Sequence, residues 1–359
     1  MSTLPMHSTI GMLGGGQLGR MAAMAAASLG YRTHVFTTKA KAPSTQVTDL
    51  VTIGAWEDRA ALTSFASQCD VITIEFENIP IDAVRHLDSI CPVHPGARAL
   101  KICQDRALEK SMLANLGIET TSWREVDSLQ ALEQAASEIG LPAVLKTATL
   151  GYDGHGQVKI TTQEGVARAW KHVGEKRSVL EGFVDFKREL SIVAARSKGG
   201  QMAFYPLVEN QHTEEHILSR TLAPAPSMTP TLAASAAKIV KRIAESLDYI
   251  GVLAVEFFQT QDDRLLVNEI APRPHNSGHW TMDGCVTSQF EQQIRAVTGL
   301  PLGDTSPRFK TTMVNLLGEE ILERDAMLAL PNRRVHIYGK VGLRPGRKMG
   351  HVNILEPLP

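Results

Sequence analysis

Two short apolar segments joined by a polar turn place the strongest constraint on the fold of this 359-residue chain. Residues 251–258 and the first part of 265–279 are rich in β-branched side chains, as strands are, and the turn centres on residues 262–263. Glu256 and Glu269 lie six residues before and after the two turn residues. In an antiparallel hairpin this symmetry predicts that the two carboxylates face each other on one surface.

Facing carboxylates repel each other unless a cation lies between them. Magnesium takes hard oxygen ligands, including one or two carboxylates, and completes its shell with water and nucleotide phosphates. The hairpin therefore predicts a floor for Mg-ATP, and the alternative is a solvent-facing hairpin with solvated glutamates. The segment from Arg273 to His279 favours the first interpretation, because it combines a cation, two imidazoles, an amide and a hydroxyl in a stretch held extended by prolines.

Length and composition limit the class of protein. A chain of this length contains two or three domains, and its 43% apolar content suffices for their cores. The formal net charge of −1 provides no overall field for nucleic acid or an anionic membrane, and we expect neither as a partner. The four cysteines lack metal-type spacing, so we expect reduced thiols and a cytoplasmic location. Glycines and Arg20 interrupt the apolar N-terminal stretch, which predicts neither a signal peptide nor a membrane span.

The N-terminal third alternates strands and helices, which predicts a parallel sheet with helices on both faces. Gly14, Gly16 and Gly19 have dinucleotide-type spacing, but residues 37–39 lack the acid that would hold an adenosine ribose, so an NAD site is disfavoured. The turn then binds another phosphate or only joins strand to helix. Glu75, with Glu77, ends the fourth strand, where it meets a ligand or caps a loop. We predict strands near 9–13, 33–36, 51–53 and 71–76, and helices near 20–29, 58–67 and 81–87.

The next segment combines a lysine with a glycine-rich loop. Lys146 ends an apolar strand, where a buried amine needs an anion. Gly151–Gln157 follows with three glycines and lacks the Walker ending, so it is either a mobile lid over a triphosphate or a plain hairpin turn. Glu181, in a later strand, is placed to accept from an adenine amine. We predict helices at 99–116 and 129–139 and strands at 121–126, 142–147 and 178–184.

The second half predicts an antiparallel sheet followed by a small mixed tail. Basic residues concentrate near a turn at 344–351, which suits a phosphate monoester, although a solvated basic turn is equally consistent with the residues. The predicted strands are 188–195, 202–208, 216–223, 312–317 and 335–338, and the predicted helices are 231–247, 288–297 and 319–328.

These motifs together carry a resemblance. Lys146, the glycine loop, Glu181 and the acidic hairpin occur in the order typical of the ATP-grasp superfamily. The sequence resembles the 5-(carboxyamino)imidazole ribonucleotide synthase family of purine biosynthesis more closely still, over essentially the whole chain. The segments that carry this closer likeness are Gly14–Met21, Gly151–Gln157, Asn268–Trp280 and Arg344–His351.

The resemblance implies an α/β and α+β ATP-grasp architecture: a Rossmann-like domain at 1–98, a linker helix and lid at 99–185, a central antiparallel domain at 186–305 and a C-terminal appendage at 306–359. It also implies a homodimer. The implied reaction converts ATP, bicarbonate and 5-aminoimidazole ribonucleotide into the N-carboxylated nucleotide, ADP and phosphate, with Mg²⁺ as the metal.

The resemblance also assigns residues. Glu256 and Glu269 match magnesium ligands, and relatives often carry Asn where this chain has Ala271, so one metal or phosphate contact is missing here or comes from Asn268. The positions that match ATP-binding residues are Arg106, Lys146, Gly151, Tyr152, Asp153, Gly154, His155, Gly156, Gln157, Glu181, Gly182, Phe183, Val184, Glu189, His212, Asn268 and Glu269.

A mechanism follows as a hypothesis: bicarbonate is phosphorylated to carboxyphosphate, and positioning and charge neutralisation drive the transfer. We expect Arg273 and Lys146 to act in the chemistry, with Tyr152 and Asp153 in the closing lid. The predicted substrate-binding residues are Gln17, Glu75, Arg273, His275, Asn276, Ser277, Lys340, Arg347 and Lys348. Three alternatives remain: a formate-dependent ATP-grasp transformylase, an NAD-dependent dehydrogenase and a silent nucleotide-binding regulator.

Overall fold

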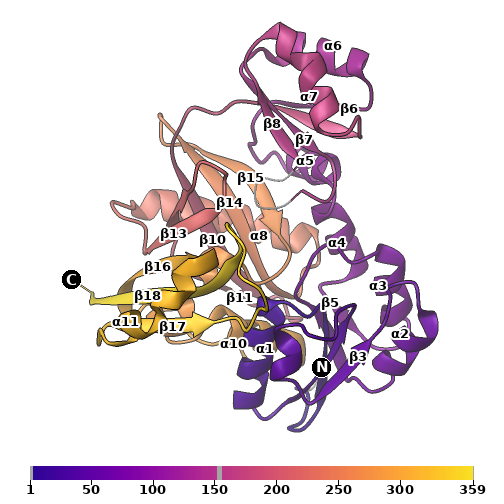
Figure 1. Ribbon diagram of the computed structural model, residues 1–359, viewed down its shortest axis with the longest axis vertical. Coiled ribbons are helices and arrows are strands. Elements are labelled where there is room, and N and C mark those ends of the chain that lie inside the picture. Colours follow the sequence, from indigo (N-terminus) through magenta and orange to yellow (C-terminus); the bar gives the residue numbers. More distant parts are fainter. Residues whose placement is uncertain (1–2, 152–155, 359) are drawn as a thin grey trace.

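The computed structural model describes residues 3–151 and 156–358, which form three β-sheets with helices packed around them (Figure 1). The N-terminal sheet is parallel, and the other two sheets are antiparallel. The smaller antiparallel sheet projects at the top of Figure 1, and the larger one extends through the middle of the molecule to the C-terminal strands. This architecture confirms the predicted fold class.

The parallel sheet has the strand order β3-β2-β1-β4-β5. The predicted alternation of strands and helices is present, and the sequence pattern missed only the two-residue strand β5, which lies between two prolines. The elements are β1 (Thr9–Leu13), α1 (Gln17–Ser28), β2 (Arg32–Thr37), β3 (Leu50–Ile53), α2 (Arg59–Ala66), β4 (Val71–Ile74), α3 (Ile81–Asp88) and β5 (Val93–His94).

The single helix predicted for residues 99–116 is wrong, because the structure has two helices, α4 (Ala97–Cys103) and α5 (Arg106–Asn115). The Asp105 carboxylate accepts two backbone N–H groups from the first turn of α5, at 3.0 and 3.1 Å. This N-cap starts a new helix although the helical pattern continues through it. As a consequence, Arg106 is the first residue of a separate helix, α5, and the start of this helix is directed at the central hairpin.

The small antiparallel sheet, called the lid sheet below, has the strand order β6-β9-β7-β8. It has an apolar core of its own, which includes Leu132, Leu145 and Leu180. The lid sheet and its helices therefore form a compact unit. The elements are β6 (Trp123–Val126), α6 (Leu129–Ile139), β7 (Ala143–Thr147), β8 (Gln157–Ile160), α7 (Val166–His172) and β9 (Ser178–Gly182).

The large sheet has the order β15-β14-β10-β12-β13-β16-β18-β17, with β11 paired to β10. The strands are β10 (Phe186–Arg196), β11 (Met202–Phe204), β12 (Val208–His212), β13 (Leu218–Ala223), β14 (Gly251–Thr260), β15 (Leu265–Ala271), β16 (Phe309–Leu317), β17 (Arg333–Ile337) and β18 (Lys348–Pro357). The helices are α8 (Pro230–Ser246), α9 (Thr281–Gly284), α10 (Gln289–Thr298) and α11 (Arg324–Leu328), and 3₁₀ turns lie at Ser44–Gln46, Gln163–Gly165, Asn276–Gly278 and Gly318–Glu323.

Three local predictions in this half are corrected. The strand predicted at 202–208 is two strands, β11 and β12, which pair with different parts of β10. The helix predicted at 319–328 begins as a 3₁₀ turn and becomes helical only at Arg324. The basic stretch 344–351 is a turn only up to Arg347, because Lys348 begins the long strand β18.

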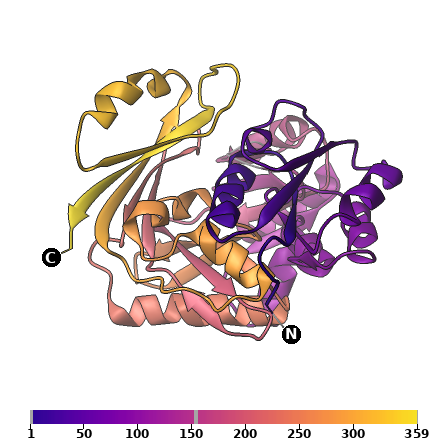
Figure 2. The ribbon, with the colours of Figure 1, turned by 90° about the horizontal axis from the view of Figure 1, so that it is seen from below.

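The C-terminal strands belong to the same sheet as the central hairpin, since β16 pairs with β13 and β18 pairs with β16. In Figure 2 the C-terminal segment lies at the upper left and the N-terminal domain at the right, and the two meet where Gln46 Nε2 donates to the Gly339 carbonyl at 2.7 Å. The proposed domain boundaries at 98, 185 and 305 stay predictions. Within the described residues, no helix is both long and apolar enough to span a membrane.

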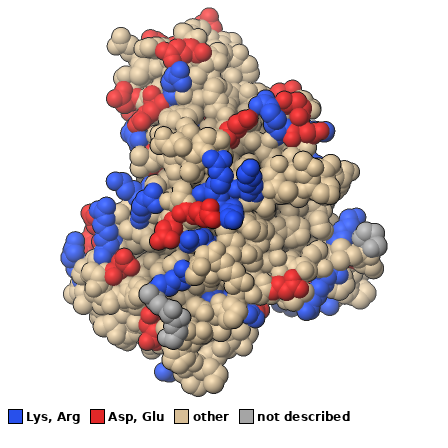
Figure 3. Space-filling model, turned by 180° about the vertical axis from the view of Figure 1, so that it is seen from behind, with Lys and Arg blue, Asp and Glu red and all other residues tan. Residues whose placement is uncertain are grey.

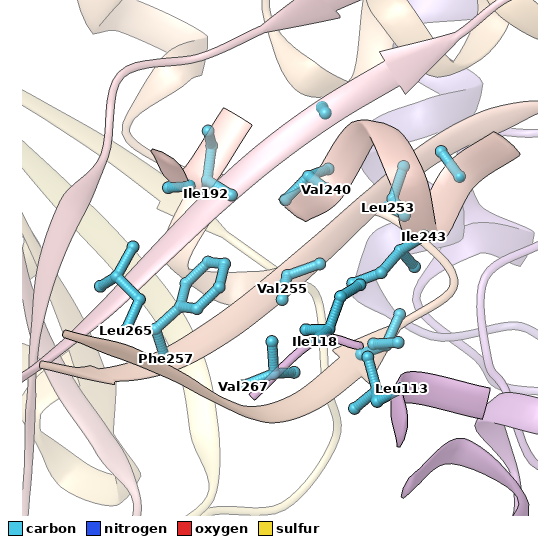
Figure 4. Packing of buried hydrophobic residues seen from close by; sticks show 14 of the residues in the cluster. Leu113, Ile118, Ile192, Val240, Ile243, Leu253, Val255, Phe257, Leu265 and Val267 are labelled. Atoms are coloured by element: carbon cyan, nitrogen blue, oxygen red, sulfur yellow. The ribbon is translucent and has the colours of Figure 1, made fainter. Parts of the chain in front are cut away.

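One face of the central hairpin packs into the largest apolar core (Figure 4). Val255 and Phe257 from β14 and Val267 from β15 lie against Val240 and Ile243 of α8. Because strand side chains alternate between faces, the intervening residues of the hairpin point away from this core. Burial of these apolar side chains therefore fixes which face of the hairpin is left for a ligand.

Candidate active site

The predicted hairpin is formed by β14 and β15, and Glu256 pairs directly with Glu269. The register is irregular: Phe257 pairs with Val267, so Asn268 is an extra residue that forms a β-bulge. Glu256, Asn268 and Glu269 all line one cavity. The bulge thus directs two successive side chains of β15 into the cavity, whereas a regular strand would send them to opposite faces.

This cavity has a volume of about 830 Å³, within the range of sites that enclose a small-molecule ligand. Residues of the N-terminal domain, the lid sheet and the large sheet all contribute to its wall. Viewed from behind, the molecule shows several basic side chains and an acidic group side by side near the middle of this face, below the lid (Figure 3). The cavity therefore lies where the three sheets converge and is strongly charged.

The two opposed acids have different proton affinities. Burial raises the pKa of Glu256, and repulsion from Glu269 raises it further. Burial also opposes ionisation of Glu269, but Arg106 and Lys146 outweigh it and lower the pKa of this carboxyl. The Arg106 Nη1 atom lies 3.0 Å from Glu269 Oε2. The pair therefore has one firmly ionised carboxylate and one that needs a further cation to stay ionised.

The donor set at this place suits magnesium. Within residues 3–151 and 156–358, no group of three or more His, Cys, Asp or Glu side chains is arranged to enclose a metal. Glu256, Glu269 and the amide oxygen of Asn268 instead present hard oxygen atoms on one side only. Magnesium commonly keeps its remaining positions for water and nucleotide phosphates. The residues therefore fit a Mg²⁺ ion that is shared with a bound nucleotide.

A buried cluster of charges lies between the lid sheet and α5. Lys146 Nζ is 2.8 Å from Glu181 Oε2, and Lys110 Nζ is 3.0 Å from Glu181 Oε1. Burial opposes ionisation of Glu181, but the two lysines lower its pKa to about 2. Lys146 also donates to Asn268 Oδ1 at 3.3 Å, across the cavity. Lys146 thus meets the anion that its position predicted, whereas no pattern in the sequence pointed to Lys110 as a second partner.

The apolar end of the cavity is lined by Val144, Phe183 and Val184 from the lid side and by Phe258 from the hairpin. Phe258 stacks on Phe186 with ring centroids 4.9 Å apart. Such a surface fits a planar heterocycle. Glu181, predicted to accept from an adenine amine, already has both oxygens beside lysines, and the Phe183 N–H already donates to the Pro142 carbonyl at 3.1 Å.

Arg273 forms a two-pronged ion pair with Glu77. Its Nη2 lies 2.7 Å from Glu77 Oε1, and its Nε contacts the other carboxylate oxygen. Burial opposes ionisation of Glu77, but Arg273 lowers the pKa of that carboxyl below its ordinary value. Both side chains line the cavity. Glu77 is therefore the partner of the predicted guanidinium, and sequence spacing could not show this because the residues are far apart in the chain.

The glycine turn after β1 is occupied by the carboxylate of Glu75. The Gly16 N–H donates to Oε1 at 2.7 Å, and the Gly19 N–H donates to Oε2 at 3.3 Å. Glu75 therefore fills the position where a helix N-terminus would hold a pyrophosphate. The contacts of Glu75 are those of a loop cap, which is one of its two predicted roles. Because the carboxylate occupies the turn, the alternative of a dinucleotide site at this turn is wrong. Glu75 and Gln17 nevertheless line the cavity.

Some residues of the segment after β15 line the cavity, and others support these residues from behind. His275 and Asn276 line the cavity, and Asn276 exchanges two amide hydrogen bonds with Asn315, at 2.9 and 2.7 Å. Ser277 was expected to line it too, but its side chain is fully buried, 2.8 Å from the His275 Nδ1 atom. This placement corrects the expectation, because the Ser277 hydroxyl is bonded to Ser191 and His275 and does not reach the cavity wall.

The predicted basic phosphate site is only partly assembled at the cavity. Lys348 lines the wall, at the start of β18. Lys340 and Arg347 are absent from the lining: Lys340 Nζ donates to the Lys348 carbonyl at 2.6 Å, and Arg347 donates to the carbonyls of Val341 and Gly342. The turn residues are thus tied to their own backbone, and only Lys348 faces the cavity.

Most of the expected nucleotide-binding residues converge on the cavity. Those that line it are Arg106, Lys146, Gly151, Gln157, Glu181, Gly182, Phe183, Val184, Glu189, His212, Asn268 and Glu269. Gly156 is outside the lining, and its carbonyl accepts from the Thr147 N–H at 2.8 Å. Tyr152, Asp153, Gly154 and His155 lie outside the described residues. The wall also contains residues that the sequence did not single out: Lys159, Phe186, His216, Leu218 and Phe258.

The family models that match this chain define the class of protein to which it belongs. Residues 111–290 match the model of the ATP-grasp domain, residues 6–104 match the ribonucleotide synthetase preATP-grasp domain, and residues 311–357 match the phosphoribosylaminoimidazole carboxylase C-terminal domain. The protein is therefore an ATP-grasp enzyme, as the opposed acids and the cationic wall suggest. Within that class it belongs to the N5-carboxyaminoimidazole ribonucleotide synthase family.

Individual relatives agree over the full length. The N5-carboxyaminoimidazole ribonucleotide synthase of Brucella melitensis is 44% identical, covering 99% of this chain and 98% of its own. A solved synthetase in complex with ADP superposes with a TM-score of 0.94 at 39% identity, covering 99% and 94% of the two chains. The Aspergillus clavatus synthase, solved with ADP and 5-aminoimidazole ribonucleotide, superposes with a TM-score of 0.92 at 29% identity, covering 98% and 94%.

Proposed function

We propose that this protein carboxylates 5-aminoimidazole ribonucleotide with bicarbonate, coupled to conversion of ATP to ADP and phosphate, as a step of purine biosynthesis. The observation that carries the proposal is the convergence of Glu256, Glu269, Lys146, Arg106 and Arg273 on one cavity. The names of the full-length relatives and the bound ADP and 5-aminoimidazole ribonucleotide in solved family members support it.

The nucleotide fits with its phosphates over the hairpin and its base at the apolar end. Glu256 and Glu269, with Asn268 beside them, would hold Mg²⁺, which supplies charge neutralisation for phosphoryl transfer. Asn268 would provide the contact that relatives make with Asn at the position of Ala271, because the bulge turns its amide into the cavity. Lys146 and Arg106 would bind phosphate oxygens, exchanging their carboxylate partners for the nucleotide.

The acceptor chemistry needs an activated carbon. Bicarbonate is a poor electrophile, so its oxygen first takes the γ-phosphoryl group of ATP, giving carboxyphosphate and ADP. The exocyclic amine of the ribonucleotide then attacks the carbon, phosphate leaves, and the amine loses a proton. Arg273 would hold the bicarbonate and the carboxyphosphate, because its guanidinium lines the cavity just past the end of β15, beside Glu77 of the N-terminal domain. The ion pair with Glu77 would keep it oriented.

The substrate phosphate would bind at Lys348, and Gln17 also lines the cavity. Lys348→Ala is therefore expected to raise the KM for 5-aminoimidazole ribonucleotide at least tenfold, since it removes the cavity-lining cation of the basic segment, and to leave the KM for ATP within about twofold. Initial-rate kinetics with each substrate varied in turn give both constants. Arg347→Ala is the matched control and should have a smaller effect. An effect on ATP alone would contradict the assignment.

An ADP-release assay tests the proposed function directly. Release should require both bicarbonate and 5-aminoimidazole ribonucleotide, and formate should not replace bicarbonate. Product is followed by incorporation of labelled bicarbonate carbon into the nucleotide. Formate-dependent release with glycinamide ribonucleotide would instead indicate a transformylase. Nucleotide binding without any turnover would indicate a silent regulator.

We also propose a homodimer in the cytoplasm, on the basis of the family resemblance and the reduced cysteines. The described free thiols are Cys69, Cys91, Cys103 and Cys285. Size-exclusion chromatography with light scattering gives the mass in solution. A mass of one 39.1 kDa chain at micromolar concentration would rule out the dimer.

A further inference from the structure

A continuous chain of buried hydrogen bonds leads from the large sheet to His275. The Thr221 hydroxyl donates to Asn210 Oδ1 at 3.1 Å, and Asn210 Nδ2 donates to the Ser191 hydroxyl at 2.8 Å. The Ser191 hydroxyl donates to the Ser277 hydroxyl at 2.8 Å, and Ser277 Oγ lies 2.8 Å from His275 Nδ1. Ser191, Thr221 and Ser277 are fully buried, and Asn210 is 5% exposed.

The direction of these bonds fixes the position of the imidazole proton. The backbone N–H of Ser277 points at His275 Nδ1 from 3.3 Å, and a backbone N–H can only donate. The Ser277 hydroxyl accepts from Ser191, so its own hydrogen is left for the same ring nitrogen. Nδ1 therefore accepts from both donors of Ser277, and in the neutral ring the proton must lie on Nε2.

The other ring nitrogen faces the hairpin floor. His275 Nε2 lies 3.1 Å from Glu256 Oε1. With its hydrogen on Nε2, the ring donates to this oxygen and leaves Glu256 Oε2 for a ligand. The backbone is held as well, because the Gln289 side chain accepts from His275 N–H at 2.9 Å and donates to its carbonyl at 2.7 Å. Both the ring and the backbone of His275 are thus fixed.

We infer that Ser277, Ser191 and Asn210 are positioning residues that hold His275 as the Nε2–H tautomer, so that His275 serves as a fixed hydrogen-bond donor to Glu256. This arrangement orients the carboxylate that faces Glu269. It also leaves His275 with no lone pair toward the cavity, so the ring is not the base that receives the proton of the substrate amine. The expected effect on turnover rests on the proposed function, whereas the tautomer does not.

Nitrogen-15 NMR of the full-length protein labelled at the histidine rings tests the inference without nucleotide or metal, because ring shifts distinguish the two tautomers. The His275→Gln variant identifies the signals of this residue. The wild-type protein should show a single Nε2–H form. Ser277→Ala should introduce the Nδ1–H form, because only the longer backbone contact then holds Nδ1. A wild-type ring protonated on Nδ1, or unchanged signals in Ser277→Ala, would overturn the inference.

Kinetics provide the second readout. Ser277→Ala should lower kcat about tenfold or more, as loss of an outer-shell partner commonly does. Ser191→Ala should have a smaller effect, and the double variant should be no slower than Ser277→Ala, because both substitutions break one chain. Additive losses would contradict this. Ser178→Ala is the control: its hydroxyl is equally buried but donates to the Lys176 carbonyl at 2.7 Å, and kcat should stay within twofold.

The two proposals can fail separately. A single Nε2–H signal in a protein that never releases ADP with bicarbonate would disprove the proposed function and leave the tautomer assignment intact. Normal bicarbonate-dependent turnover with an Nδ1–H ring would do the reverse. Ser191→Ala also protects the test from misfolding of the Ser277 variant, because it leaves the His275 loop itself unaltered.

Discussion

At the residue scale, the cavity is organised by buried charges that have found partners inside the protein. Arg273 is paired with Glu77, Lys146 with Glu181, and Arg106 with Glu269. A buried ion pair stabilises little by itself, because desolvation offsets much of the attraction. These pairs instead keep each cation oriented toward the place where the proposed phosphate or carboxyphosphate would bind.

Arg273→Ala should lower kcat at least a hundredfold while the Kd for ADP changes less than threefold, because the proposed role of the guanidinium is to hold the reacting carbon and not the nucleotide base. Stopped-assay kinetics and isothermal titration calorimetry measure the two quantities. Arg264→Ala, at the exposed hairpin turn, provides the control, since its ion pairs lie on the surface. Near-normal turnover of the Arg273 variant would remove it from the chemistry.

Glu109 makes stability depend on pH. Burial raises the pKa of its carboxyl from the ordinary value of 4.5 to about 8. The folded protein therefore holds a proton that the unfolded chain releases, so this contribution is complete below about pH 4.5 and is lost as the pH rises through 8. The full shift corresponds to at most about 5 kcal/mol of unfolding free energy.

Glu109→Gln should remove that dependence, because an amide has no proton to release and its oxygen can still accept the Ile270 N–H that Glu109 binds at 3.0 Å. Urea unfolding at pH 5.5 and pH 8.5 should show a smaller loss of stability in the variant than in the wild type. Glu133→Gln, on an exposed position of α6, should follow the wild type. Parallel pH curves for all three proteins would contradict the prediction.

At the element scale, the break between α4 and α5 determines where Arg106 begins its helix. The Asp105 carboxylate caps α5 and also binds Arg177 of the lid segment, with Arg177 Nη1 at 2.6 Å from Asp105 Oδ2. One side chain thus connects the helix that carries Arg106 to the strand region that carries Glu181. The irregular residue of β15 has a comparable effect, because the bulge at Asn268 brings an amide beside Glu269.

Asp105→Ala should destabilise the protein by about 1–2 kcal/mol through loss of the N-cap. It should also raise the KM for ATP severalfold, because the first residue of α5, Arg106, is then no longer held in a fixed position. Asp105→Asn keeps the cap and should cost less than about 0.5 kcal/mol. Asp58→Ala removes the cap of α2, whose carboxylate accepts from the Ala61 N–H at 3.0 Å, without touching the cavity. It should lower stability similarly and leave KM unchanged. Equal KM in all variants would refute the link.

At the scale of the whole molecule, the cavity exists only where the N-terminal domain, the lid sheet and the large sheet meet. The lid sheet has a core of its own, the hairpin belongs to the largest core, and the N-terminal sheet shares one of its two cores with α10. Contacts between the lid sheet and the rest of the cavity are largely polar, as in the pairs of Lys146 with Asn268 and Arg177 with Asp105. A ligand that bridges the lid sheet and the hairpin should therefore stabilise both together.

Mg-ADP at a hundred times its Kd should raise the unfolding free energy by about 2.7 kcal/mol. Hydrogen exchange should show added protection in β7, β9, β14 and β15, which carry the charged wall, and little change in β2 and β3. ADP with a chelator of divalent cations is the control and should give weaker protection of the hairpin. Protection confined to the N-terminal sheet would place the nucleotide elsewhere.

The sequence determined the elements whose signals are local. Alternating strands and helices predicted the parallel sheet, and the spacing about residues 262–263 predicted that Glu256 opposes Glu269, which the register confirms. Lys146 at the end of an apolar strand predicted a buried anion partner. Such patterns are readable because backbone periodicity and turn chemistry act over a few residues.

Only the tertiary structure decided the partners. Glu77 for Arg273, Lys110 for Glu181, the capping role of Glu75 and the burial of Ser277 all depend on contacts between segments far apart in the chain. No spacing rule encodes such contacts, because they arise when distant segments of the chain pack against one another. The sequence therefore specifies which charges are available, and packing specifies which of them are already neutralised before a substrate arrives.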